Sequence, residues 1–118
     1  MKAVDQKFIL SSGDDTSCLD FMLSGGQGVI SVISHVIPKE LRAFADRARK
    51  KDGEVRAVYK RYSQLNSLMS VESNPIPVKM ALYLMGIIDS PELRLPLVTL
   101  SEQNKKNLQV ELTQLGVI

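Results

Sequence analysis

Two short apolar runs near the start of the chain constrain its fold most strongly. Residues 7–11 (KFILS) and 28–33 (GVISVI) are rich in aromatic or β-branched residues and are bounded by turn residues, which predicts buried strands. Between them, the apolar residues of 18–23 predict a short helix that stops at Gly25-Gly26. A strand, a helix and a strand with short connections form a βαβ unit, so the two strands should be parallel.

After these runs the sequence predicts only helices, with apolar residues at helical spacing in 38–48, 55–69, 78–85 and 101–115. One further helical turn is expected at 90–92. The stripe expected on one face of the second helix comprises Val55, Val58, Tyr59, Tyr62, Leu65 and Met69. Two parallel strands form no stable sheet by themselves, because both faces and both edges need cover. The pattern therefore indicates one edge of a larger sheet.

Composition narrows the class of protein further. The 118 residues are 44% hydrophobic and 24% charged, which is ordinary for one globular domain. A single cysteine excludes a disulfide framework and a multi-cysteine zinc site. No apolar run approaches the roughly 18 residues of a membrane helix, and Asp5 and Lys7 interrupt the segment where a signal peptide needs an apolar core. We expect a cytoplasmic protein that contacts no membrane.

The segment Ser12-Gly13-Asp14-Asp15 ends the first predicted strand at its carboxyl end, where barrel and open-sheet enzymes place their sites. Gly13 would let the backbone approach a ligand there. The plainer interpretation is a tight strand-to-helix turn whose two carboxylates complement the helix dipole, and the motif alone favours it. Asp14 and Asp15 have no third ligand nearby, so no metal site is predicted.

Four other sequence features could suggest a functional site, but a structural role explains each of them better. Gly25-Gly26-Gln27-Gly28 lacks the Lys-Ser/Thr of a phosphate loop and enters a strand, so it predicts a helix stop. Cys18 lies on an apolar stripe and should be a buried, inert thiol. His35 has no evident catalytic partner. Between residues 42 and 61, eight Lys/Arg face three Asp/Glu, which favours the solvated side of two helices over a nucleic-acid surface.

Five segments in order carry a specific resemblance: FILSSGDD (8–15), LDFM (19–22), GGQGVISV (25–32), NPIPVK (74–79) and LRLPL (93–97). Together they resemble the C-terminal part of the 4-hydroxy-tetrahydrodipicolinate synthase (dihydrodipicolinate synthase) family. The resemblance covers nearly the whole chain. One departure is Ser73, which stands where the family more often has proline.

This resemblance implies an α/β fold, the C-terminal portion of a (β/α)₈ TIM barrel. The two strands would be its last two parallel strands. Residues 1–50 would hold the last two βα units of the barrel, and residues 51–118 a C-terminal helical extension. A closed barrel needs about 250 residues, more than twice the length of this chain.

The family implies a Schiff-base class I aldolase-type lyase, which condenses pyruvate with aspartate semialdehyde in lysine biosynthesis without a cofactor. On the matching positions, Gly13 would line the substrate pocket and Ile30 would offer its backbone carbonyl to the pyruvate-derived group. The Schiff-base lysine and the proton-relay tyrosine would lie upstream of Met1, and neither Lys7 nor Lys79 matches them. The resemblance therefore implies no catalytic residue in this chain and no activity alone.

An alternative remains open: a non-enzymatic remnant that self-associates or binds a partner, such as a complementing N-terminal half. In either case a sheet without its neighbours would leave apolar strand residues under-buried. The residues expected to be affected are Phe8, Leu10, Val29, Ile30 and Val32.

Overall fold

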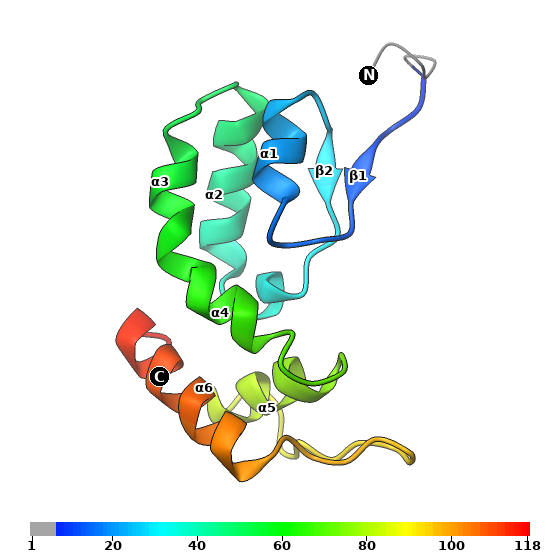
Figure 1. Ribbon diagram of the computed structural model, residues 1–118, viewed down its shortest axis with the longest axis vertical. Coiled ribbons are helices and arrows are strands. Elements are labelled where there is room, and N and C mark those ends of the chain that lie inside the picture. Colours follow the sequence, from blue (N-terminus) through cyan, green and yellow to red (C-terminus); the bar gives the residue numbers. More distant parts are fainter. Residues whose placement is uncertain (1–6) are drawn as a thin grey trace.

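A two-stranded parallel sheet lies on one side of the protein, as a computed structural model of residues 7–118 shows (Figure 1). Strands β1 (Ser11–Ser12) and β2 (Gly28–Val29) pair in parallel, and helix α1 (Cys18–Leu23) connects them. The predicted βαβ unit is therefore confirmed. Asp5, which argued against a signal peptide, lies outside the described residues.

Helices make up the rest of the architecture. After the 3₁₀ turn η1 (Ile33–His35), the helical elements in chain order are α2 (Pro38–Arg49), α3 (Val55–Tyr59), the 3₁₀ turn η2 (Lys60–Tyr62), α4 (Ser63–Leu68), α5 (Ile76–Leu84) and α6 (Glu102–Leu115). Pro38 begins α2, where the fixed φ of proline suits a first turn, and Gly116 ends α6 with a left-handed φ of 72°. In Figure 1 the sheet, α1, α2 and α3 form the upper part, and α4, α5 and α6 the lower.

Apolar packing holds both parts together. In the upper part, the Phe44 ring of α2 lies 5.4 Å from the Tyr59 ring and 5.5 Å from the Tyr62 ring, between centroids. In the lower part, Leu65 of α4 is fully buried, as are Leu108 and Leu112 of α6. Aromatic pairs at this spacing add roughly 0.5–1.5 kcal/mol to the burial itself.

The strands are shorter than predicted, which corrects the expectation of strands over 7–11 and 28–33. Only Ser11–Ser12 and Gly28–Val29 are paired, and Ile33 begins a 3₁₀ turn. Each strand has a neighbour on one side only, so few residues find a ladder partner. The side chain of Gln27 extends the pairing, because its Oε1 accepts a hydrogen bond from the Leu10 N–H at 2.7 Å.

The single helix predicted over 55–69 is also corrected. It is divided into α3, η2 and α4, and Val58, expected on the buried face, is 47% exposed. The other members of the expected stripe, among them Tyr62 and Leu65, are buried as predicted. No helical turn forms at 90–92.

Lys51 joins the C-terminal ends of α1 and α2. It is the only non-glycine residue with a positive φ (62°) in the described part of the chain, at the turn that follows α2. Its Nζ donates a hydrogen bond to the carbonyl oxygen of Leu23, at 2.7 Å. This places a positive charge on the C-terminal end of α1, where the helix dipole favours it.

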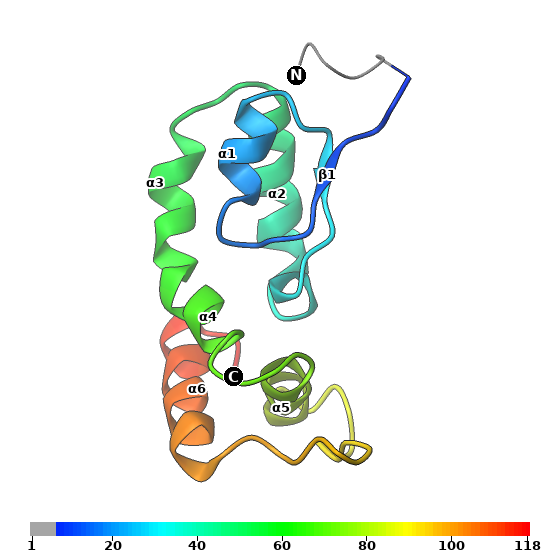
Figure 2. The same ribbon diagram turned by 45° about the vertical axis from the view of Figure 1, so that its right-hand side comes forward.

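The described chain is less compact than one domain of its size. Its radius of gyration is 15.7 Å, against about 13.5 Å expected for this length. Figures 1 and 2 show the strands standing at the edge of the upper part, with no element on their outer side in the described chain. Phe8 is 63% exposed and Ile30 78%, as the sequence predicted, whereas Leu10, Val29 and Val32 are half-buried.

We expect a sharp contrast between two glycines. A Cβ at Gly26 would overlap the ring of Phe21, whereas a Cβ at Gly13 would meet no atom within 4 Å. Gly26→Ala should therefore lower the free energy of unfolding by about 1–3 kcal/mol, and Gly13→Ala should leave it unchanged within about 0.5 kcal/mol. Urea denaturation followed by circular dichroism measures both values. Equal stability of the two variants would contradict the packing described around Phe21.

Candidate functional site

Gly13 and Ile30 come together at the carboxyl edge of the sheet. In the observed register Ser12 lies opposite Val29, so the next residues along, Gly13 and Ile30, are neighbours. The Ile30 N–H donates to the Ser12 carbonyl oxygen at 2.8 Å, which fixes Ile30 at this edge. Within residues 7–118 no hydrogen bond reaches the Ile30 carbonyl oxygen, so that oxygen is free to accept a bond from a ligand.

Asp15 connects the turn after β1 to the end of β2. Its Oδ2 accepts hydrogen bonds from the backbone N–H groups of Val32, at 2.8 Å, and Ile33, at 3.0 Å. The carbonyl oxygen of Asp15 accepts a further bond from the Tyr59 hydroxyl at 2.8 Å. Asp15 therefore sets where the two strand ends lie relative to each other and to α3.

Asp14 stabilises the turn that leads into α1. Its Oδ2 accepts bonds from the Ser17 hydroxyl at 2.6 Å, the Thr16 hydroxyl at 2.6 Å and the Ser17 N–H at 2.7 Å. These bonds, the Ser17 hydroxyl first, lower the pKa of the Asp14 carboxyl below its ordinary value of 3.8. The plainer interpretation of the motif, a strand-to-helix turn, is thus present in the structure.

A pocket of about 330 Å³ opens directly beside Gly13. The polar residues that line it include Asp14, Asp15, Asn66 and Glu72. Ile30 is not one of the lining residues, so only one of the two expected substrate-binding residues faces this pocket. Glu72 is held by the Asn104 side-chain amide at 2.8 Å and by the Ser101 N–H at 3.1 Å, which lower its pKa.

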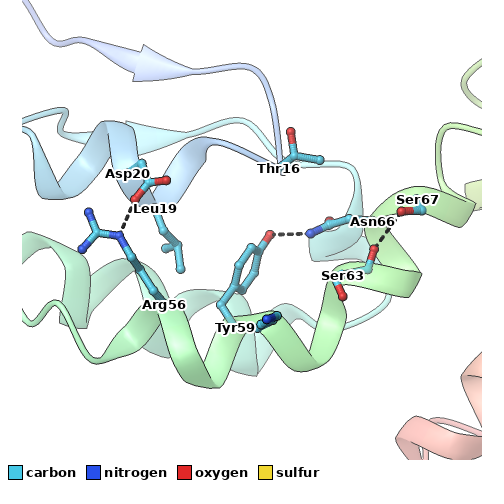
Figure 3. Close-up of a pocket in the computed structure, with 9 residues that line it drawn as sticks. Thr16, Leu19, Asp20, Arg56, Tyr59, Ser63, Asn66 and Ser67 are labelled. Atoms are coloured by element: carbon cyan, nitrogen blue, oxygen red, sulfur yellow. Dashed lines mark hydrogen bonds and ion pairs between the residues drawn. The ribbon is translucent and has the colours of Figure 1, made fainter.

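A second pocket, of about 320 Å³, lies between α1 and the α3–α4 segment (Figure 3). Arg56 reaches across its mouth to Asp20, with the Nε and Oδ1 atoms 2.5 Å apart. Asn66 donates a hydrogen bond from Nδ2 to the Tyr59 hydroxyl at 3.2 Å. Thr16 and Asn66 line both pockets.

Comparison with known proteins decides the family. The model of the Dihydrodipicolinate synthetase family matches residues 1–115. This chain belongs to that family. Its relatives include the 4-hydroxy-tetrahydrodipicolinate synthases of Bdellovibrio bacteriovorus, 46% identical over 100% of this chain, and of Coxiella burnetii, 47% identical over 92%. The chain spans 41% and 37% of the length of these two relatives.

Solved structures of the dihydrodipicolinate synthase family support the same assignment. The enzyme from Aquifex aeolicus superposes with a TM-score of 0.93 at 33% identity, over 98% of this chain and 40% of that one. The chloride-inhibited enzyme from Acinetobacter baumannii, complexed with pyruvate, gives 0.92 at 36% identity, over 99% and 40%. The short parallel sheet with its helices therefore has the architecture of part of the family's barrel.

The thiol and tyrosine predictions are confirmed. Cys18 is fully buried, and burial raises the pKa of its thiol to about 11. Its Sγ donates to the Asp15 carbonyl oxygen at 3.3 Å. Tyr59 and Tyr62 both belong to the core, and burial raises the pKa of Tyr59. The raised pKa keeps the Cys18 thiol protonated at neutral pH, so it is not a ready nucleophile.

Half of the cations in the basic segment 42–61 are engaged within the described part of the protein. Four of its eight cations are engaged: Arg42 with Asp46 at 2.9 Å, Arg47 with Asp52 at 2.6 Å, Arg56 with Asp20, and Lys51 with the end of α1. This arrangement favours the solvated-surface interpretation. That the segment binds no nucleic acid stays a prediction.

The described residues contain neither a metal-ligand cluster nor a membrane-spanning helix. Over residues 7–118 no cluster of three or more His, Cys, Asp or Glu side chains is placed to hold a metal ion. No helix in that same range is both long and apolar enough to span a bilayer.

Removing the Asp14 carboxylate should destabilise the turn before α1. Asp14→Ala loses three hydrogen bonds, two of them from Ser17, the N-cap residue of α1, so we expect a loss of roughly 0.5–2 kcal/mol near pH 7. Because the folded pKa lies below the unfolded one, this contribution is complete above the ordinary pKa and lost as the pH falls through the folded value. Urea titrations from pH 7 to pH 2 should therefore show the two proteins converging in stability at acid pH. A constant difference across this range would contradict the assignment.

Proposed function

We propose that this chain forms the C-terminal wall of an aldolase-type lyase site that condenses pyruvate with aspartate semialdehyde, a step towards lysine. The observation that carries the proposal is the meeting of Gly13 and Ile30 at the carboxyl edge of a parallel sheet. Family membership supports the reaction class, and the pyruvate complex of the Acinetobacter baumannii enzyme supports the substrate. In barrel enzymes this edge is where sites lie.

The chain would shape the substrate pocket and position a hydrogen-bond acceptor in it. The open space beside Gly13 would admit the pyruvate-derived group, since no side chain occupies it. The free Ile30 carbonyl oxygen would accept a hydrogen bond from that group. The Asp15 carboxylate, through Val32 and Ile33, would hold this carbonyl in place.

The covalent chemistry would come from the N-terminal portion of the barrel. There a lysine amine would attack the pyruvate ketone and expel water to form an iminium ion. Loss of a methyl proton, relayed by a tyrosine, would give an enamine that attacks the aldehyde carbon. Water would then release the product and regenerate the amine. We propose that residues 1–50 contribute the last two βα units and residues 51–118 the helical extension, and that the chain alone is inactive.

A second candidate function is a non-enzymatic remnant that self-associates or binds a partner. The exposed Phe8, Ile9 and Ile30 side chains, beside strands paired on one side only, favour an association of some kind. The lyase proposal explains the same exposure by the missing barrel strands, so it accounts for more of what is observed.

Complementation tests the proposal. We expect that co-expression with the N-terminal portion of the Bdellovibrio bacteriovorus relative, ending where this chain's match begins, yields a complex that forms a borohydride-trapped adduct with pyruvate. Each half alone should form none or far less. Mass spectrometry of the trapped complex locates the adduct. A complex that assembles and forms no adduct would contradict the proposal and leave the remnant function.

The matched controls are two substitutions in this chain. Gly13→Val fills the open space and should reduce adduct formation at least roughly tenfold by blocking the substrate position. Val110→Ala, on the exposed face of α6, should leave it unchanged. Equal yields from the two variants would exclude Gly13 from the pyruvate site.

A further inference from the structure

The outer edge of β1 presents an unpaired row of backbone groups. In Figure 1 β1 lies outermost in the upper part, with β2 between it and the helices. The carbonyl oxygens of Leu10 and Ser12 accept hydrogen bonds from the chain at β2. Successive residues of a strand direct their backbone groups to opposite edges, so those of Ile9, Ser11 and Gly13 face outward.

This edge is open at both ends in the described part of the chain. Within residues 7–118 no hydrogen bond reaches the backbone N–H or carbonyl oxygen of Ile9 or Gly13. The Ile9 side chain is 81% exposed, and a Cβ at Gly13 would meet no atom within 4 Å. An exposed strand edge with an apolar side chain is a template for pairing with another chain. One end of the edge thus carries a protruding side chain and the other end an empty space.

The edge is complementary to itself about Ser11. When two copies of β1 run antiparallel with their Ser11 residues opposed, Ile9 of each copy lies opposite Gly13 of the other. Directly opposed residues project from the same face of a sheet, so each Ile9 side chain would enter the open space beside a Gly13. Each opposed pair would exchange two backbone hydrogen bonds. A parallel pairing in the same register would instead place Ile9 beside Ile9 and leave both spaces empty.

The charges at the two ends of the edge favour the same antiparallel arrangement. Lys7 precedes the edge, and Asp14 and Asp15 follow it. Antiparallel pairing brings the basic end of one copy to the acidic end of the other, whereas parallel pairing brings like charges together. Hydrogen bonds from the Ser17 hydroxyl lower the pKa of Asp14, so the acidic end stays ionised at neutral pH. Shape and charge therefore select the same partner, a second copy of the edge.

We propose that the outer edge of β1, residues 9–13, binds the same edge of a second copy of this chain, antiparallel about Ser11. The two-stranded sheets of both copies then join into one continuous four-stranded sheet. A pair of strands is marginal in water, and three or more strands with an apolar face are needed for independent stability. The inference concerns the chain without a complementing N-terminal portion, and it holds whether or not the chain takes part in the lyase reaction.

Cysteine crosslinking of the 118-residue chain tests the register. In the proposed pair the two Ser11 Cα atoms lie about 5.5 Å apart, within reach of a disulfide. Ser11→Cys should therefore form a covalent dimer under mild oxidation, and mass spectrometry locates the bond. Phe8→Cys, exposed on the same strand, is the matched control, because antiparallel pairing separates its two copies by about 20 Å and should prevent a crosslink. Equal crosslinking of both variants would overturn the proposal, as would none at Ser11→Cys.

Sedimentation equilibrium of the same chain measures the strength of the pairing. Ile9→Lys places a charge on the edge and Gly13→Val fills the open space, so each should raise the dimer dissociation constant at least roughly tenfold. Ile9→Lys keeps the test decisive should Gly13→Val fail to fold. Val110→Lys, on the exposed face of α6, is the matched control and should leave the constant unchanged. A monomer at all concentrations, or equal constants for Ile9→Lys and Val110→Lys, would overturn the inference. Neither result bears on the complementation experiment, because that experiment follows a pyruvate adduct.

Discussion

The carboxylate and carbonyl of Asp15 connect three parts of this protein. One carboxylate oxygen accepts two backbone N–H groups at the end of β2, and the backbone carbonyl accepts the Tyr59 hydroxyl from α3. The turn after β1, the end of β2 and the third helix are thereby fixed to one residue. Charge-assisted bonds of this kind are about twice as strong as neutral ones. The positions of Gly13 and Ile30 depend on this connection.

Most of the fold followed from local patterns in the sequence. The parallel strand pair was predictable because two β-branched runs flank one short helix, and the meeting of Gly13 and Ile30 follows from it. The burial of Cys18 was predictable from its apolar stripe. The length of the strands was not, because pairing depends on neighbouring strands that local patterns cannot show. The sequence also did not reveal that a 3₁₀ turn at 60–62 interrupts the helix. Val58 and Tyr59 both fit the helical spacing of apolar residues, and only tertiary packing determines that Tyr59 is buried and Val58 exposed.

The polar interactions of the site were the least predictable part. Asn66 and Glu72 lie about fifty residues or more from Gly13 in the sequence, and no motif marks them. Their proximity depends on how α4 and the loop after it pack beneath the first βα turn. The Asp14–Asp15 pair stands out in the sequence, but the sequence does not separate the roles of the two carboxylates. One carboxylate stabilises its own turn, whereas the other reaches seventeen residues along the chain.

The contact made by Lys51 connects two helices without involving the strands. A left-handed backbone at a non-glycine residue costs on the order of 1 kcal/mol, and here the side chain that causes the cost also ties the end of α1 to the end of α2. The helices that follow β1 and β2 in the chain are thus joined by one side-chain hydrogen bond. This connection does not pass through the strands, so it would hold the two helices together even where the outer strand edges are left uncovered.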